Sequence, residues 1–275
     1  MNPLKKLLRK LPGLHRQRQP IPRPASLAAA AAGFEFARNW PAIPEARASE
    51  SPSMAPNLAP NPLRTYFEKN KVGRGIWKWE HYFEIYHNHF REFVGRDVGV
   101  VEIGVYSGGS LRMWRNYFGS QSRIHGVDIE EACRVYEEEG VRLHIGDQSD
   151  RAFWRRFKQA VPLLDVVIDD GGHTAEQQTT TLEELLPHLR PGGVYLCEDI
   201  HRDHNQFAAY LSGYANHLNF QLPKPGVHLT SAVSNFQRAV YSIHLYPFVG
   251  VIQRCRQSPT EFVAPKNGSE WQPFL

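Results

Sequence analysis

From about residue 98 onward, short apolar segments alternate with segments of helical periodicity. Residues 98–105, 123–129, 141–147, 163–170 and 192–199 are apolar runs that predict five strands. Between most of them, apolar residues recur at the spacing of a helix. Strands alternating with helices are typical of an α/β fold, in which helices cover both faces of a mostly parallel sheet. We therefore expect a doubly wound, mostly parallel sheet.

Two later segments extend this sheet, and one earlier segment adds a helix. Residues 239–246 and 248–255 flank Pro247 and predict an antiparallel C-terminal strand pair, which brings the expected sheet to seven strands. Residues 75–95 place aromatic and aliphatic side chains at helix-compatible spacing. The folded domain is expected to span residues 63–275.

Residues 1–62 differ from the rest in composition. The first 33 carry seven basic residues and no acidic one, although the whole chain has a net charge of only +4. Residues 41–62 are rich in Pro, Ala and Ser. We expect a disordered basic tail and linker. Three interpretations stay open: a peripheral membrane contact through residues 1–20, an organelle-targeting peptide within residues 1–33, and an inert tail.

Charge and cysteine content exclude several classes of protein. A nucleic-acid-binding domain would be basic, whereas the chain beyond the tail carries a net negative charge. No apolar run is long enough to cross a membrane. The three cysteines are widely spaced, so neither a disulfide framework nor a thiolate zinc site is expected. These features favour a cytoplasmic protein, and an oligomer is compatible with them.

Ligands of an open α/β sheet bind at the carboxyl ends of its strands, so the residues there carry the most information. The first strand ends in the glycine-rich "GVYSGGS" (104–110), which lets backbone approach a ligand. The second ends at Asp128, and the third at Asp147 and Gln148. A lone acid there is usually a turn former or a helix cap. The series along one edge favours a nucleoside pocket in which acids accept hydrogen bonds from ribose.

The fourth and fifth strands each end in paired carboxylates, Asp169 with Asp170 and Glu198 with Asp199. Because side chains alternate along a strand, at least one acid of each pair should converge with the other pair. Converging carboxylates repel one another unless a proton or cation neutralises them, and oxygen ligands favour Mg²⁺, then Mn²⁺ or Ca²⁺. His173 is a candidate general base. The alternative is a simple turn with His173 as a helix cap.

Taken in order and spacing, these motifs resemble the class I S-adenosylmethionine-dependent methyltransferases. The motifs are "VEIGVYSGGSLRMW", "GVDI", "GDQSD", "VIDDGGH" and "LRPGGVYLCEDI". Within that class they are most similar to the metal-dependent sugar O-methyltransferases of macrolide biosynthesis, of the mycinamicin and tylosin type. The resemblance covers about residues 65–255.

The resemblance implies a Rossmann-like methyltransferase fold with S-adenosylmethionine and Mg²⁺, or Mn²⁺, as cofactors. It assigns the metal to Asp170, Glu198 and Asp199, and the general base to His173. It assigns the cofactor contacts to Glu102, Gly104, Gly108, Asp128, Asp147 and Gln148. Gly172 departs from the pattern, because these enzymes often have serine there.

The expected activity is Mg²⁺-dependent methylation of a hydroxyl on a sugar or another diol-containing metabolite, so the partner is a small-molecule or glycan acceptor. Three alternatives remain. A metal-dependent glycosyltransferase would share the acids and the nucleotide pocket, but it would carry them in one Asp-x-Asp motif. An iron oxygenase would need two histidines and a carboxylate, and His201 lies close enough to keep it open. A non-catalytic methyltransferase-fold binding module would have no need of repelling carboxylates.

Overall fold

The computed structural model describes residues 23–39, 60–200, 206–220, 222–224, 229–265 and 267–268. The chain divides into one unit of Ala59–Lys266 and another of Met1–Leu58 with Asn267–Leu275. In the second unit, Arg23–Arg38 form helix α2, which the sequence analysis did not predict. Its run of alanines favours a helix, and its described side chains are exposed. Residues 1–20, on which the membrane interpretation rests, lie outside the described residues.

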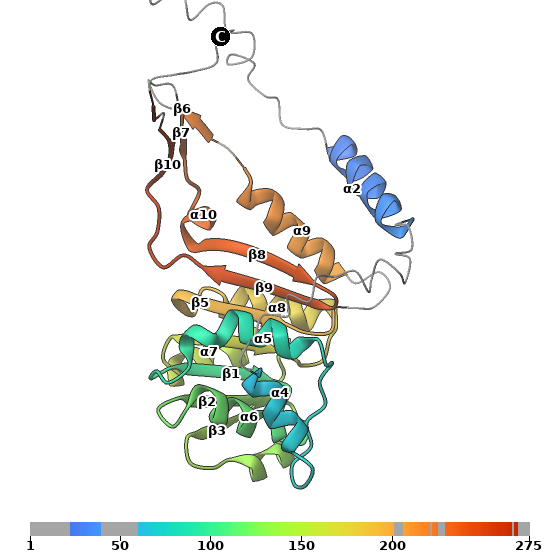
Figure 1. Cartoon of the computed structure of the whole chain (residues 1–275), viewed down its shortest axis with the longest axis vertical. Coiled ribbons are helices and arrows are strands. Elements are labelled where there is room, and N and C mark those ends of the chain that lie inside the picture. The colour runs from blue at the N-terminus through green and yellow to red at the C-terminus, as the bar shows by residue number, and fades with distance from the viewer. Residues whose placement is uncertain are drawn as a thin grey trace, which may run out of the picture. The chain divides into compact units, whose positions relative to one another are not determined.

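Seven strands form the main sheet in the order β3-β2-β1-β4-β5-β9-β8 (Figure 1). Their bounds are Gly99–Ile103 (β1), Arg123–Asp128 (β2), Val141–Ile145 (β3), Leu164–Asp169 (β4), Leu189–Cys197 (β5), Val240–Tyr246 (β8) and Val249–Arg254 (β9). Strands β1 to β5 pair in parallel, whereas β9 is antiparallel to both β5 and β8. The seven-stranded sheet with an antiparallel C-terminal pair is therefore confirmed.

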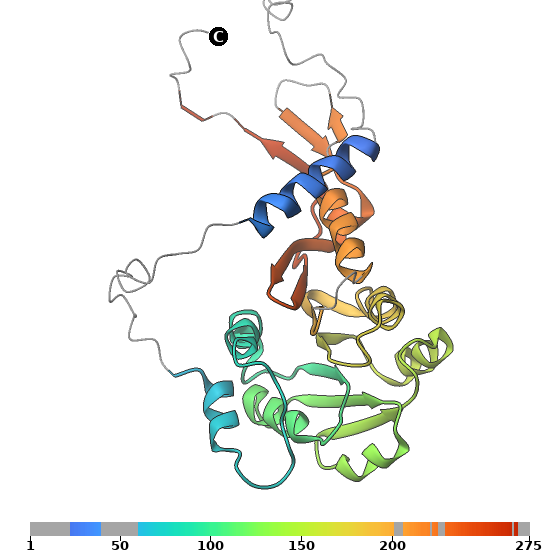
Figure 2. The same cartoon turned by 90° about the vertical axis from the view of Figure 1, so that its right-hand side faces the viewer.

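Helices cover both faces of this sheet (Figures 1 and 2). One face packs against α4 (Pro62–Lys69), α5 (Tyr82–Phe90) and α6 (Gly109–Phe118), and the other against α7 (Arg151–Ala160), α8 (Ala175–Leu185) and α9 (Gln206–Leu218). Alternation along β1 shows why two cores form. Val100 is buried in the first and Val101 in the second.

The remaining elements are short. They are η2 (Arg91–Phe93), η3 (Glu131–Tyr136), β6 (Leu222–Lys224), β7 (Leu229–Ala232), α10 (Asn235–Ala239) and β10 (Glu261–Ala264). Strands β10, β7 and β6 form a separate antiparallel sheet, which the sequence analysis did not predict. Among the described helices, none is both long and apolar enough to span a bilayer.

One expected helix is shorter than its periodicity suggested. Helix α5 begins at Tyr82, whereas helical spacing extended back to residue 75. Residues 75–80 instead line a cavity at the edge of the sheet. This segment lies close against the start of α6, since a Cβ atom added to Gly109 would meet the carbonyl oxygen of Gly75 at 2.2 Å. Polar contacts of Lys78 and Trp79, described below, hold it there.

Candidate active site

A cavity of about 1060 Å³ lies at the carboxyl ends of the parallel strands. It is the region where an α/β sheet binds its ligands. Its wall includes Gly104 after β1, Asp128 at the end of β2, Asp147 and Gln148 after β3, Asp170, Gly172 and His173 after β4, and Glu198 and Asp199 after β5. All five strand ends that the sequence analysis singled out therefore meet in one cavity.

Asp128 organises the loop that follows β1. Its Oδ2 atom accepts hydrogen bonds from the backbone N–H groups of Val105, at 2.8 Å, and Tyr106, at 3.2 Å. Gly104 has φ of 89°, and a Cβ atom there would lie 1.9 Å from the carbonyl oxygen of Asp170. Only glycine fits so close to the end of β4. Asp128 and Gly104 both line the cavity, so their location is compatible with the predicted contacts with the cofactor. The contact of Asp128 with ribose and the contact of Gly104 in the loop after β1 stay predictions.

Asp147 and Gln148 are more engaged with the protein than the sequence analysis suggested. Asp147 Oδ1 accepts hydrogen bonds from the backbone N–H and the hydroxyl of Ser149, as a turn former does. Gln148 donates from Nε2 to Asp169 Oδ1, at 3.1 Å, and accepts at Oε1 from the N–H of Gly172, at 2.7 Å. Gln148 therefore positions the loop after β4, and its predicted contact with adenine stays a prediction.

Glu102 and Gly108 are not among the described residues that line the cavity. The side chain of Glu102 is fully buried in β1, where Oε2 accepts a hydrogen bond from the Ser110 hydroxyl at 2.6 Å. Gly108 is the N-cap residue of α6, with φ of 69°. Burial raises the pKa of Glu102, although the nearby charge of Lys78 and the bond from Ser110 act in the opposite direction.

The two acids at the end of β4 have different surroundings, as strand alternation predicted. Asp169 is buried and accepts hydrogen bonds from Tyr195 Oη, at 3.0 Å, and from Gln148. Burial raises its pKa to about 7. Asp170 lines the cavity instead. Asp169 is therefore structural, and Asp170 is the member of this pair that can meet a ligand.

Asp170, His173 and Asp199 converge on one point. One ligand atom from each lies within 4.8 Å of the others. His173 Nε2 is 3.9 Å from Asp170 Oδ1 and 3.5 Å from Asp199 Oδ2. The N-cap of α8 is Thr174, which makes a capping box with Gln177, so His173 is free of the capping role. Two carboxylate oxygens and an imidazole nitrogen suit a divalent cation or a proton-transfer site.

Glu198, the third predicted metal ligand, has a different partner in the structure. Its side chain is 1% exposed, and its Oε1 and Oε2 atoms lie 3.0 and 3.1 Å from Lys78 Nζ. Burial raises the pKa of Glu198 well above its usual value, and the charge of Asp170 acts in the same direction while Lys78 opposes it. Its role as a metal ligand stays a prediction.

Three residues of the site were missed by the sequence analysis: Lys78, Trp79 and Tyr82. Lys78 Nζ donates to Asp170 Oδ2 at 2.6 Å, in addition to its contacts with Glu198. Trp79 Nε1 and Tyr82 Oη donate to Asp199 Oδ1 at 3.2 and 2.7 Å. A lysine between two tryptophans in an apolar run is the signal that could have drawn attention to them.

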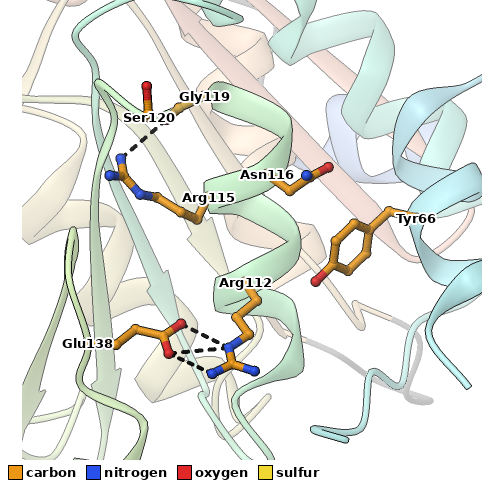
Figure 3. A pocket seen from close by; sticks show the side chains of 7 residues that line it. All are labelled: Tyr66, Arg112, Arg115, Asn116, Gly119, Ser120 and Glu138. Carbon is orange, nitrogen blue, oxygen red and sulfur yellow. Dashed lines mark hydrogen bonds and ion pairs between the residues drawn. The ribbon is translucent and has the colours of Figure 1, made fainter. Parts of the chain in front are cut away.

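A second pocket, of about 500 Å³, lies beside α6 (Figure 3). Two arginines line it, but both bind protein groups. Arg112 makes a bidentate pair with Glu138, at 2.9 and 2.7 Å, and Arg115 donates to the carbonyl oxygens of Gly119 and Ser122. With both guanidinium groups engaged, we assign no ligand to this pocket.

Comparison with known proteins agrees with the fold. Residues 101–200 match a family described as "Methyltransferase domain". The chain is 36% identical over 169 residues to demethylmacrocin O-methyltransferase of Streptomyces fradiae. This match covers 59% of this chain and 39% of that protein. The chain is 38% identical over 136 residues to mycinamicin VI 2''-O-methyltransferase of Micromonospora griseorubida, covering 47% of this chain and 32% of that protein. It thus spans well under half of either relative.

A solved structure shows the same relationship. MycE methyltransferase from the mycinamycin biosynthetic pathway, in complex with Mg and SAH, superimposes with a TM-score of 0.59 at 27% sequence identity. The match covers 72% of this chain and 55% of MycE. The resemblance to the sugar O-methyltransferases of macrolide biosynthesis and the methyltransferase fold are therefore confirmed.

Proposed function

We propose that the protein is an S-adenosylmethionine-dependent O-methyltransferase that uses a divalent cation, Mg²⁺ first, to act on a hydroxyl of a sugar. One observation carries the proposal: Asp170, His173 and Asp199 converge within a cavity that also contains the glycine-rich loop after β1 and Asp128. Three relatives that are 36–38% identical to this chain are named as O-methyltransferases. Their names do not favour the glycosyltransferase alternative or the non-catalytic binding module.

The residues present fit the implied cofactors. Asp170 and Asp199 offer hard oxygen ligands of the kind that Mg²⁺ prefers, and Glu198 lies beside them on the same cavity wall. Asp128 and Gly104 line the same cavity, which supports their proposed role in holding the nucleoside part of S-adenosylmethionine. An iron oxygenase fits less well, because His173 is the only histidine in the cluster among the described residues. His201, which kept that alternative open, lies outside them.

His173 is proposed as the general base. A bound divalent cation would lower the pKa of the acceptor hydroxyl. His173 then takes the hydroxyl proton, with Asp199 3.5 Å from its Nε2 atom to favour the imidazolium that forms. A bond forms between the acceptor oxygen and the methyl carbon as the sulfonium carbon–sulfur bond breaks, which leaves S-adenosylhomocysteine. The protein's main contribution is to hold the reacting groups together.

The acceptor is proposed to carry its hydroxyl on a sugar ring. Relatives are named for O-methylation of demethylmacrocin, of mycinamicin VI and of 8-demethyl-8-alpha-L-rhamnosyl tetracenomycin-C, the last of which carries a rhamnosyl group in its name. In this chain Trp77, which is 86% exposed, and Trp79 line the cavity beside the candidate metal ligands. Exposed indole faces suit the apolar face of a sugar.

Calorimetry on the purified protein tests this proposal. S-adenosylhomocysteine, NAD and UDP-sugars are titrated in turn, each with and without Mg²⁺. Of these ligands, we expect only S-adenosylhomocysteine to bind. In a second assay, a labelled methyl group from S-adenosylmethionine should be transferred to members of a panel of glycosylated macrolides and polyketides. Binding of a UDP-sugar instead would favour the glycosyltransferase alternative.

A further inference from the structure

We propose that Lys78 is a positioning residue for the divalent cation. Lys78 donates hydrogen bonds to Oδ2 of Asp170, the inner oxygen, and to both carboxylate oxygens of Glu198. These bonds direct Oδ1 of Asp170, the outer oxygen, at the point shared with His173 and Asp199. The inference rests on the proposed function, and it adds a role for a residue outside the predicted metal and cofactor contacts.

The Lys78 ammonium group lies among three carboxylates, one within β1 and the others directly after β4 and β5. Its Nζ atom is 2.6 Å from Asp170 Oδ2, 3.0 Å from Glu198 Oε1 and 3.3 Å from Glu102 Oε1. Its side chain is 3% exposed. A lysine is rarely buried so completely unless it is paired, and here one cation neutralises part of the repulsion among three acids.

Glu102 shows that Lys78 is more than a substitute for a metal ion. This acid is outside the described cavity lining and is fixed from its other side by Ser110 in the first turn of α6. Lys78 is therefore anchored within the protein interior, independently of any ligand in the cavity. Without Lys78, the carboxylate of Glu102 would keep the Ser110 hydroxyl as a hydrogen-bond donor but would lose the ammonium group 3.3 Å from its Oε1 atom.

The two oxygens of Asp170 have separate tasks. Oδ2 accepts from Lys78, whereas Oδ1 is the atom that faces His173 Nε2, at 3.9 Å. The two carboxylate oxygens of Asp199 also have separate partners. Its Oδ1 accepts from Trp79 and Tyr82, and its Oδ2 faces His173.

A single segment, residues 78–82, thus holds the inner oxygen of both aspartates and leaves the outer oxygens turned toward one point. Partners of this kind fix the orientation of metal ligands, and their loss typically costs about 10–100-fold in metal affinity. The chain just before this segment is also held by the protein, because Gly75 lies close against Gly109 at the start of α6. The position of the segment is therefore set by the protein before any ion binds.

Mn²⁺ binding, followed by electron paramagnetic resonance on the full chain, tests the proposal. Removing Lys78 alone leaves the buried carboxylate of Glu102 without its cationic partner, which can unfold the protein. We therefore compare Lys78→Met/Glu102→Gln with Glu102→Gln, a pair that differs only at Lys78. The double variant should bind Mn²⁺ about 10–100-fold more weakly than Glu102→Gln. Its affinity for S-adenosylhomocysteine should match that of Glu102→Gln, which a general structural defect would not allow.

Lys71→Met is the matched control, because Lys71 is exposed and lies seven positions earlier in the chain. It should bind Mn²⁺ like the wild type. Equal or tighter Mn²⁺ binding by the double variant would overturn the positioning role of Lys78 while leaving the metal site intact. A wild type that binds no Mn²⁺ would overturn the metal site itself, and this inference with it.

Discussion

His173 Nε2 lies 3.5 Å from Asp199 Oδ2, and both residues have a left-handed backbone, with φ of 58° and 56°. This conformation is costly for residues other than glycine, at about 1–3 kcal/mol each, and it persists where the surrounding structure enforces it. Here Trp79 and Tyr82 hold Asp199 from behind. The backbone strain is therefore located at the point where the site brings its candidate base and a candidate metal ligand together.

His173→Ala should separate the base from the metal ligands. Methyl transfer at neutral pH should fall by about 10²–10⁴-fold, as expected for loss of a general base. Mn²⁺ affinity should be retained, and the rate should recover in part at high pH, where the acceptor hydroxyl ionises unaided. Steady-state rates from pH 6 to 10, with Mn²⁺ titrations alongside, provide the check. Loss of Mn²⁺ binding would instead make His173 a ligand, and an unchanged rate would move the base elsewhere.

Asp128→Ala should weaken the binding of S-adenosylhomocysteine by about 1–3 kcal/mol, because a charge-assisted hydrogen bond is lost and the amides of Val105 and Tyr106 lose their acceptor. Isothermal calorimetry measures the change. Asp150→Ala is the control, since Asp150 caps α7 and is not among the described lining residues of the cavity. Equal affinities in wild type and Asp128→Ala would remove the ribose assignment.

Deletion of residues 1–60 should leave the methyltransferase domain folded. The cut falls close to the boundary between the two units, and it spares Asn61, which caps α4 and donates to the carbonyl oxygen of Phe83. Thermal unfolding and S-adenosylhomocysteine affinity should match the full chain. Binding to anionic liposomes should decrease, and in the full chain it should weaken with salt. An unfolded truncation product would show that the domain begins earlier than residue 63.

A histidine pair in the sheet should lower the free energy of unfolding as the pH falls below neutral, whereas Asp169, whose pKa is raised, acts in the opposite direction. Burial, with a contribution from His144, lowers the pKa of His125 to about 4, and burial also lowers that of His144. The folded state then binds fewer protons than the unfolded state, so this stabilisation is present above about pH 6.5 and is lost as the pH falls toward 4. Urea unfolding of the wild type and His125→Gln at pH 7.5 and 5 checks this contribution. The free energy of unfolding of the wild type relative to that of the variant should be lower at pH 5 than at pH 7.5. The same pH dependence in both proteins would contradict this assignment.

Much of the fold could be predicted because buried parallel strands are short apolar runs with distinctive ends. The convergence of the acids at the ends of β2, β4 and β5 on one cavity could be predicted for the same reason, since right-handed connections bring those ends to one edge. Alternation along β4 also separated Asp169 from Asp170. These features depend on local sequence and on the period of a strand.

Other features depend on tertiary contacts that no local pattern encodes. Ile76 and Trp79 have helical spacing, yet Lys78 and Trp79 are drawn to acids more than 90 positions away in the chain. Glu102 has the position of a cofactor contact, but its side chain is fully buried and accepts a hydrogen bond from Ser110, which lines the cavity. The helix α2 follows from alanine content, which the composition of the surrounding linker concealed.

The most direct test of the central claim is a Mn²⁺ titration of the wild type, Asp170→Asn and Asp169→Asn in the presence of S-adenosylhomocysteine. The wild type should bind one ion. Asp170→Asn should lose most of its affinity, because a ligand of the converging cluster is gone. Asp169→Asn should lose less, because that side chain is buried against Tyr195 and Gln148 and is not among the described residues that line the cavity. Equal Mn²⁺ binding by Asp170→Asn and the wild type would contradict the account.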